Sequence, residues 1–303
     1  MKKLILFMVL VFGIATGISA ADYELHSNTS NSTLPACNNN GTWSINGDTF
    51  TCSETISLAS GDTVSGKNSN KTLSAKNGIT LAGNNTIGDS SYSVNLYSES
   101  NSVVINGSNN NIYGNIEGVS NGVTINSASV YGNITSPSNT VTINNSSING
   151  DVVSNGGNGI FLTNTSVSGD VTSDCCTVQT SDGSIIGNIK AGGSGLITNN
   201  TDITATTINV PNNTISITGG TISGDFSTSG GNGVQLTDVT MSSGNISTNN
   251  VNITISNSEI GDSSTSIDIT TTHEIYVQNN STVYGDLTAA EWGTNITIHK
   301  DDS

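Results

Sequence analysis

The chain has 303 residues, of which 33% are hydrophobic and only 10% are charged, and its formal net charge is −16. All seven basic residues are lysine. Nucleic acids and anionic membrane surfaces need clustered positive charge, so we expect neither as a partner. The low hydrophobic content also excludes a broad globular core. A narrow coil of strands remains possible, because it needs only a few inward aliphatic side chains per turn.

The first residues have the pattern of a secretory signal peptide, which we place at residues 1–20. Two lysines precede the apolar run Leu4–Ile14, and small residues follow up to Ala20 and Ala21. The apolar run is roughly half of the ~20 residues that a spanning helix needs. We therefore predict a bacterial protein that is secreted, on the cell surface or periplasmic, with no membrane insertion once the leader is removed.

Residues 21–72 differ from the rest and are predicted to form an N-terminal cap. Cys37 and Cys52 flank a short segment, and in an oxidising compartment this pair forms a disulfide worth about 3 kcal/mol. A metal site is the alternative, but neither His nor a third Cys lies close by. Alternating apolar residues within 53–72 indicate that coil-like strands already begin there.

Residues 73–303 are predicted to be repeats. The consecutive 18-residue units 112–129 and 130–147 share an aliphatic residue, then Gly and Asn, a second aliphatic residue, and the run V-T-I-N. A period this short predicts a solenoid. The opening aliphatic residues recur at a spacing of 18 or 19, with longer units near both ends. They are Ile112, Val130, Ile148, Val167, Ile185, Ile203, Ile222, Met241, Ile260 and Val283.

The period-two alternation within each unit predicts β-strands, and the connections are too short for helices. The fold class that we predict is all-β: a single-stranded right-handed parallel β-helix of about 18–19 residues per turn. Each strand would pair with its copy one turn later, about 4.8 Å away. A left-handed hexapeptide coil fails, because positions six residues apart read Ile112, Gly118 and Thr124.

A glycine recurs at one corner of the repeat and is followed by Asn or Asp. A corner that needs positive φ, or that leaves no room for a Cβ atom, selects glycine. Asn and Asp tolerate the left-handed region and bond to local backbone, and stacked Asn side chains can form ladders. The corner glycines are Gly114, Gly132, Gly150, Gly169, Gly187, Gly224 and Gly285.

The runs VTINSASVYGNI (123–134) and VTINNSSINGDV (141–152) resemble the repeat of bactofilins. The resemblance covers about 112–189 and returns at 222–226 and 283–287. It implies a right-handed β-helical core and polymer formation. Bactofilins are cytoplasmic, whereas this chain has a leader and a cysteine-flanked cap. Its units are also similar to those of secreted bacterial surface and pilus-associated proteins, which implies a role at the cell surface.

Two pairs of residues bear on metal and thiol chemistry. Asp151 and Asp170 should stack on adjacent turns and could hold Ca²⁺. Asn interrupts this column, however, so we favour a solvated corner and expect no metal and no cofactor. Cys175 and Cys176 are adjacent, which leaves a vicinal disulfide, a link to another molecule, or two free thiols.

We expect no catalytic site. Polysaccharide lyases and hydrolases need paired acids, or a Lys or Arg base beside an acidic sugar; the chain has no Arg, and Lys190 is the only Lys between 77 and 299. The candidates His273 and Glu274 lie in a longer unit, where exposed loop residues are the simpler explanation.

The favoured function is a structural or adhesive surface protein, with glycan or protein partners and self-association. The alternative is a carbohydrate-active enzyme on the same coil. An ice-binding protein is a third hypothesis, but its Thr column would have to persist along one face. Tyr113, Tyr131 and Tyr284 share a position beside the corner glycine, where they could contact sugars or cover strand edges.

Overall fold

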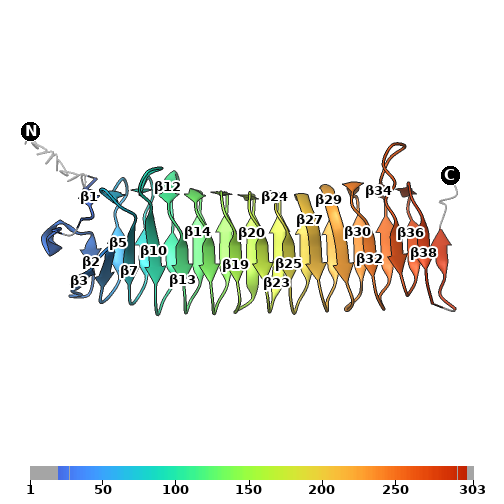
Figure 1. The fold of residues 1–303 in the computed structure, drawn as a ribbon, viewed down its shortest axis with the longest axis horizontal. Coiled ribbons are helices and arrows are strands. Elements are labelled where there is room, and N and C mark those ends of the chain that lie inside the picture. The colour runs from blue at the N-terminus through green and yellow to red at the C-terminus, as the bar shows by residue number, and fades with distance from the viewer. Residues whose placement is uncertain (1–19, 27, 292, 299–303) are drawn as a thin grey trace, which may run out of the picture.

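The computed structural model describes residues 20–26, 28–291 and 293–298. The predicted signal peptide lies outside these residues, apart from its last position. The described chain forms one long, straight coil with a terminus at each end (Figure 1). Within it, every regular element is a β-strand except η1 (Asn31–Thr33), a short 3-10 helix.

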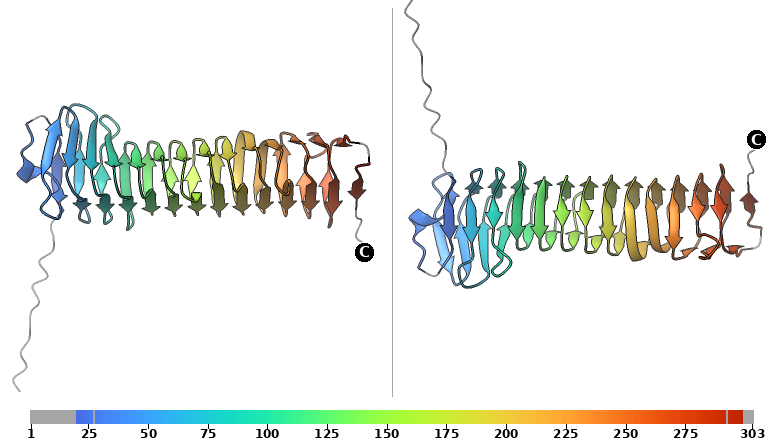
Figure 2. Two further views of the ribbon diagram at one scale, coloured as in Figure 1. Left: turned by 90° about the horizontal axis from the view of Figure 1, so that it is seen from below. Right: turned by 90° about the horizontal axis from the view of Figure 1, so that it is seen from above.

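Each regular turn of the coil contributes three strands. Two consecutive strands belong to a 25-stranded sheet that bends at a corner, and the third belongs to a 14-stranded sheet. The strands of each sheet follow one another along the whole coil in the two views of Figure 2. The prediction of an all-β parallel β-helix is therefore confirmed.

The first strands of the turns are β1 (Asp22–Glu24), β6 (Thr63–Ser65), β9 (Thr86–Ile87), β12 (Asn110–Tyr113), β15 (Ala128–Tyr131), β18 (Ser147–Ile148), β21 (Ser166–Val167), β24 (Ser184–Ile186), β31 (Thr240–Ser243), β34 (Glu259–Ile260) and β37 (Thr282–Val283). The second strands are β4 (Thr49–Cys52), β7 (Lys71–Ala75), β10 (Val94–Ser98), β13 (Ile116–Gly118), β16 (Ile134–Ser136), β19 (Val152–Ser154), β22 (Val171–Ser173), β25 (Ile189–Ala191), β32 (Ile246–Thr248), β35 (Ile269–Thr271) and β38 (Leu287–Ala289). In two turns a single strand runs through the corner: β27 (Asp202–Val210) and β29 (Thr221–Thr228).

The third strands are β5 (Ile56–Leu58), β8 (Ile79–Leu81), β11 (Val103–Ile105), β14 (Val123–Asn126), β17 (Val141–Asn144), β20 (Gly159–Thr163), β23 (Thr177–Ser181), β26 (Leu196–Asn199), β28 (Ile215–Thr218), β30 (Val234–Thr237), β33 (Ile253–Ser256), β36 (Ile275–Gln278) and β39 (Ile296–Ile298). Two further strands, β2 (Ala36–Cys37) and β3 (Trp43–Asn46), lie at the N-terminal end.

The register confirms the repeat units residue by residue. Ile112 pairs with Val130, Val130 with Ile148, and the same column continues without a slip to Val283. The column also extends backward, through Ile87. A slip of one residue would turn every inward aliphatic side chain to the solvent, so burial fixes this register.

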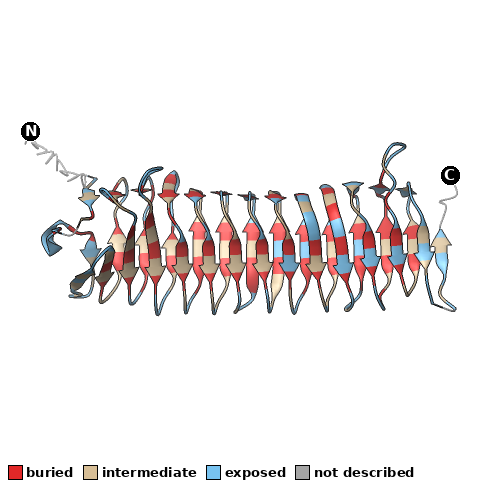
Figure 3. Cartoon of the chain, viewed as in Figure 1, coloured by how far each residue is buried: buried red, intermediate tan, exposed pale blue. Residues whose placement is uncertain are grey.

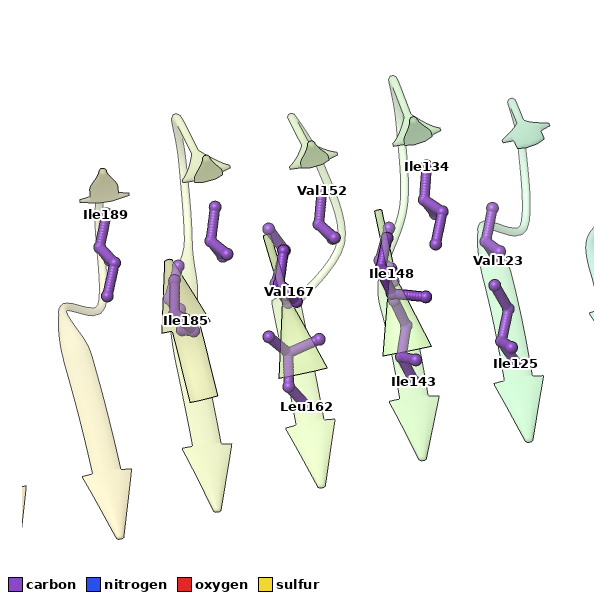
Figure 4. Packing of buried hydrophobic residues seen from close by; sticks show 14 of the residues in the cluster. Val123, Ile125, Ile134, Ile143, Ile148, Val152, Leu162, Val167, Ile185 and Ile189 are labelled. Atoms are coloured by element: carbon purple, nitrogen blue, oxygen red, sulfur yellow. The ribbon is translucent and has the colours of Figure 1, made fainter. Parts of the chain in front are cut away.

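The core is a thin thread of aliphatic side chains. Figure 4 shows the inward residues stacked as rungs, with Ile134, Val152 and Ile189 in one column and Ile143 and Leu162 in another. All five are buried. Buried and accessible positions alternate along the strands in Figure 3, as a coil with one inward and one outward face requires.

The thread is interrupted where polar side chains turn inward. Thr180 and Thr198 continue the inward column of Leu162, and both are buried. The hydroxyl of Thr180 bonds to that of Thr201 at 2.9 Å, which supplies the partner that a buried hydroxyl needs.

The N-terminal end of the coil is closed by antiparallel strands. β2 pairs with β5 and β3 pairs with β4, both antiparallel, and the cap disulfide (Cys37–Cys52, S–S 2.02 Å) joins β2 to β4. Trp43 packs against the core and its indole N–H donates to the Pro35 carbonyl at 3.2 Å. Parallel stacking already begins with β4 and β5. The strands β5 and β6 lie within residues 53–72, where the alternating apolar residues indicated that coil-like strands begin.

The corner glycines are selected by close approach of successive turns. A Cβ atom on Gly150 would lie 2.4 Å from the carbonyl oxygen of Gly132, and one on Gly187 would lie 2.2 Å from that of Gly169. At these four glycines φ lies outside the left-handed region. Lack of room for a Cβ atom is therefore the explanation that applies at these four glycines. Gly114, Gly224 and Gly285 combine close approach with positive φ (155°, 143° and 154°), so both explanations apply to them.

The Asn/Asp position after the corner glycine forms a hydrogen-bond ladder along the axis. Oδ1 of Asn133 accepts the backbone N–H of Asp151, and Oδ1 of Asp151 accepts that of Asp170, both at 2.9 Å. Only a side-chain oxygen takes part, so Asn and Asp interchange. The amide ladder expected from stacked Asn side chains lies instead on the 14-stranded sheet, where Asn144 Nδ2 donates to Asn126 Oδ1 at 2.9 Å.

A second corner, which the sequence did not reveal, carries the left-handed residues. It follows the third strand of each turn, and its φ values lie close to +50° from turn to turn, for example at Asn145 (50°), Asn164 (47°) and Asp182 (52°). Asn and Asp are the non-glycine residues that adopt this conformation most readily. These Asn and Asp residues therefore allow the chain to turn at this corner without a glycine.

Candidate binding surface

The outward residues of the coil make long walls that are mostly polar and uncharged. On the 14-stranded sheet, Thr124 and Thr142 are paired neighbours, but the column then changes to Phe161, Gln179 and Ile197. The Thr array that ice binding would need is therefore broken after two turns. A candidate binding site is therefore expected where the outward residues differ from those of the neighbouring turns.

The most exposed aromatic departure is a pair of stacked tyrosines. Tyr113 and Tyr131 occupy paired positions on β12 and β15, and their ring centroids are 4.6 Å apart with 8° between the planes. Tyr131 is 46% exposed. The separation matches the spacing of adjacent strands, so each ring rides on its own turn and the ring planes lie across the axis.

A hollow of about 280 Å³ lies directly beyond Tyr131, and we call it the tyrosine hollow. Its far end is Ile186, which is 59% exposed. Between these two ends the same outward column holds only Asn149 and Ser168, whose side chains are short. The lining residues are Tyr131, Ser147, Ile148, Asn149, Ser166, Val167, Ser168, Ser184 and Ile186, and none of them is charged.

A neighbouring groove of about 370 Å³ follows the left-handed corner. Asn109, Asn145 and Asn164 line it together with small Ser and Ala side chains. The amide of Asn164 donates to Oδ1 of Asn145 at 2.9 Å, so these amides already bond to one another. No exposed aromatic side chain lines this groove. The hydrogen bonds between its Asn side chains explain why Asn recurs there, without a ligand.

Cys175 and Cys176 form a vicinal disulfide, with S–S 2.05 Å, which resolves the three alternatives left by the sequence. It lies in the loop between β22 and β23. In the following turn Gly193 donates its N–H to the Cys175 carbonyl at 2.8 Å, and a Cβ atom there would lie 2.2 Å from that oxygen. Sγ of Cys176 lies 3.3 Å from the carbonyl oxygen of Gly157 in the preceding turn. Gly193 thus permits close approach of its turn to the backbone of Cys175.

The candidate catalytic residues are only partly brought together. Glu274 accepts a hydrogen bond from the Tyr276 hydroxyl, and this bond raises the pKa of Tyr276. His273 lines a groove of about 450 Å³ together with Asn and Gln side chains, and neither Glu274 nor Tyr276 lines it. Its Nδ1 is buried and has no hydrogen-bond partner among the described residues.

The acidic corner column is engaged in backbone hydrogen bonds. Asp170 accepts the N–H of Asn188 at 2.7 Å, just as Asp151 accepts that of Asp170. Within the described ranges, no group of three or more His, Cys, Asp or Glu side chains is placed to hold a metal ion. Lys190 pairs with Asp174 at 2.6 Å, on the loop that carries the vicinal disulfide.

Comparison with known protein families, with curated proteins and with solved structures finds no match to this chain. Across the residues that the structure describes, no helix is long and apolar enough to cross a membrane. The chain is a parallel β-solenoid whose exposed departures from the repeat are the tyrosine hollow and the vicinal disulfide loop. What it does must be inferred from these residues.

Proposed function

We propose that the chain is an exported bacterial surface protein with a structural and adhesive role. The leader pattern of residues 1–20 and the two disulfides of the described chain support export to an oxidising compartment. The coil supports the structural role, because each turn is held by its neighbours through continuous hydrogen-bonded sheets.

The observation that carries the proposal is how the side chains are divided between inside and outside. The inward columns hold nearly all the aliphatic residues, whereas the outward columns hold Thr, Ser and Asn with a few exposed aromatic side chains. Such walls offer many weak, uncharged hydrogen-bonding contacts along one rigid axis. Repeated weak contacts on one scaffold give strong overall attachment through effective concentration.

Two measurements test this proposal. The full chain, expressed with its leader in a bacterial host, should be found outside the cytoplasm, with both disulfides detected by peptide mapping without reductant. The purified exported protein should then bind a glycan array or intact bacterial cells. Reduced protein confined to the cytoplasm would refute the proposal, as would exported protein that binds neither surface.

A carbohydrate-active enzyme remains the second candidate, and the Glu274–Tyr276 pair next to His273 is the observation that favours it. A carboxyl group beside a phenol is a proton-transfer arrangement. Incubation of the exported protein with neutral and acidic polysaccharides, followed by detection of new reducing ends, tests this function. Turnover that disappears in Glu274→Gln would establish the enzyme; turnover that survives this change would place the chemistry elsewhere.

Self-association forms part of the proposed function. β39 has a paired neighbour on one side only among the described strands, and its Ile298, which continues the inward column of Ile255 and Val277, is 67% exposed. An unpaired strand edge with exposed apolar side chains is a template for another strand.

A further inference from the structure

We propose that the tyrosine hollow binds one pyranose ring of a neutral glycan, which stacks on the open face of Tyr131. This proposal rests on the adhesive function proposed above and names the ligand class and the residues that would take it. Four steps carry it: the orientation of the tyrosine ring, the shape of the hollow, the chemistry of its lining and the charge of the chain.

The orientation of Tyr131 leaves one ring face available. Its other face is covered by Tyr113, at 4.6 Å and nearly parallel. On the open side, the next two positions of the same column are Asn149 and Ser168, and neither side chain contains a ring that would continue the stack. A planar or chair-shaped ring placed one turn beyond Tyr131 would repeat the contact that Tyr131 makes with Tyr113.

The hollow has the length for such a ring and two apolar ends. Tyr131 and Ile186 are three turns apart in one column, which is about 14 Å at the spacing of parallel strands. The hollow of about 280 Å³ lies between them. Tyr131 and Ile186 are 46% and 59% exposed, so each presents apolar surface to a ligand between them.

The lining favours a sugar over an aromatic side chain of a protein partner. The hydroxyls of Ser166 and Ser184 bond to each other at 3.1 Å, and the Ser168 hydroxyl donates to Oδ1 of Asn149 at 3.1 Å. Each of these groups can donate and accept further bonds. A pyranose has an apolar face for Tyr131 and hydroxyls around its rim for these groups. A purely aromatic ring would leave their remaining donors and acceptors without further partners, at a cost in free energy.

The charge of the site selects neutral sugars. The hollow is lined by no charged residue, the chain has no arginine, and its formal net charge is −16. Carboxylated or sulfated glycans are normally held by Arg or Lys side chains, which are absent from the lining. They would also approach against the field of the whole chain.

The test measures binding of neutral oligosaccharides to the exported, oxidised chain. The probes are pentasaccharides of glucose, galactose, mannose and N-acetylglucosamine, with an oligogalacturonate as the anionic probe. Saturation-transfer NMR identifies binders, and calorimetric titration gives the dissociation constants. We expect at least one neutral probe to bind with a dissociation constant on the order of 1 mM, and the anionic probe not to bind.

Three variants locate the binding. Tyr131→Ala removes the ring face and should weaken binding about tenfold or more, whereas Tyr131→Phe keeps the face and should bind about as well as the unaltered chain. Asn149→Tyr extends the aromatic stack into the hollow and should abolish binding while the circular dichroism and melting temperature are retained. Tyr284→Ala is the matched control, because Tyr284 is similarly exposed at 40% but lies beside Glu259 and has no stacked partner among the described residues.

The outcomes separate this site from the general adhesive role. Binding of a neutral probe that is lost in Tyr131→Ala and in Asn149→Tyr, but kept in Tyr284→Ala, establishes the site. Binding that all variants retain overturns the site and leaves adhesion by the walls intact. Exported protein that attaches to cells but binds no neutral probe overturns the ligand class, and stronger binding of the anionic probe overturns the charge argument.

Discussion

Replacing a corner glycine by alanine should be costly even though the backbone conformation of that corner suits any residue. We choose Gly150→Ala, in the middle of the most regular turns. The new Cβ atom would lie 2.4 Å from the carbonyl oxygen of Gly132, 2.6 Å from its carbonyl carbon and 2.7 Å from Oδ1 of Asn133. Two of these atoms are backbone of the preceding turn, so the turns themselves must move apart.

The magnitude follows from two contributions. Overpacking of a well-packed site costs about 1–3 kcal/mol. Separating the turns also stretches the 2.9 Å bond from the Asp151 N–H to Oδ1 of Asn133, which is worth about 1 kcal/mol. We therefore expect a loss of about 2–4 kcal/mol in the free energy of unfolding.

The assay is urea unfolding followed by circular dichroism, together with hydrogen exchange to show whether the loss is centred on residues near 150. Gly47→Ala is the control, because Gly47 has φ of +60° but no atom within 4 Å of its would-be Cβ. It should lose only the cost of left-handed backbone, about 1 kcal/mol. A loss at Gly150 smaller than the loss at Gly47 would refute close approach as the reason for the glycine column.

Three further predictions concern the disulfides, the acid limb of stability and assembly. Replacing both cysteines of the cap disulfide by serine should lower the free energy of unfolding in urea by about 3 kcal/mol. The same change at the vicinal disulfide should lower it by only about 1 kcal/mol, because that bond closes a loop of sequence separation 1. Equal losses at the two disulfides would contradict this. Hydrogen bonds from Thr221 lower the pKa of Asp202 below its ordinary value of 3.8. The stability that this carboxylate contributes is present above pH 3.8 and is lost as the pH falls through the lower pKa of the folded state. Asp202→Asn should therefore make the melting temperature depend less on pH in this acid range. Light scattering of the chain at high concentration should show association, because β39 has a paired neighbour on one side only among the described strands; a monodisperse monomer would contradict this.

The inward half of the repeat could be predicted from the sequence because burial allows only one register. Each opening aliphatic residue from Ile112 to Val283 lies on its counterpart, as the 18- and 19-residue spacing predicted. The longer steps did not disturb the column, because the extra residues lie in outward loops. An example is the loop of Asp262, whose carboxylate accepts the N–H groups of Ser264 and Thr265.

The left-handed corner could not be predicted, although its residues are plainly visible in the sequence. Asn145, Asn164 and Asp182 are spaced as regularly as the corner glycines, but Asn is so common in this chain that the column does not stand out. These residues are distinguished from the other Asn and Asp residues by their left-handed backbone, which the composition of the sequence does not reveal. The vicinal disulfide was undecided because adjacent cysteines are equally compatible with a disulfide, a link to another molecule or two free thiols.

The tyrosine hollow could be located only after the register was known. The sequence placed Tyr113 and Tyr131 in one column and left open whether they contact sugars or cover strand edges. Once Asn149, Ser168 and Ile186 are placed in the same column, the stack visibly ends at Tyr131 and resumes as an apolar side chain three turns later. A hollow in a solenoid thus depends on which residues follow one another along a column of successive turns. A single repeat unit does not contain this information.

Function in such a coil should be sought where the outward columns depart from the repeat, because the inward columns have no freedom to vary. The corner ladder illustrates the difference: it uses one side-chain oxygen, so Asn133 and Asp151 are equivalent to the fold although their charges differ. An outward ring adds nothing to the aliphatic core, although the stack of Tyr131 on Tyr113 itself stabilises the fold by about 1 kcal/mol. The core does not require the exposed Tyr131 and Ile186 around an uncharged hollow, and this is the reason for proposing ligand binding there.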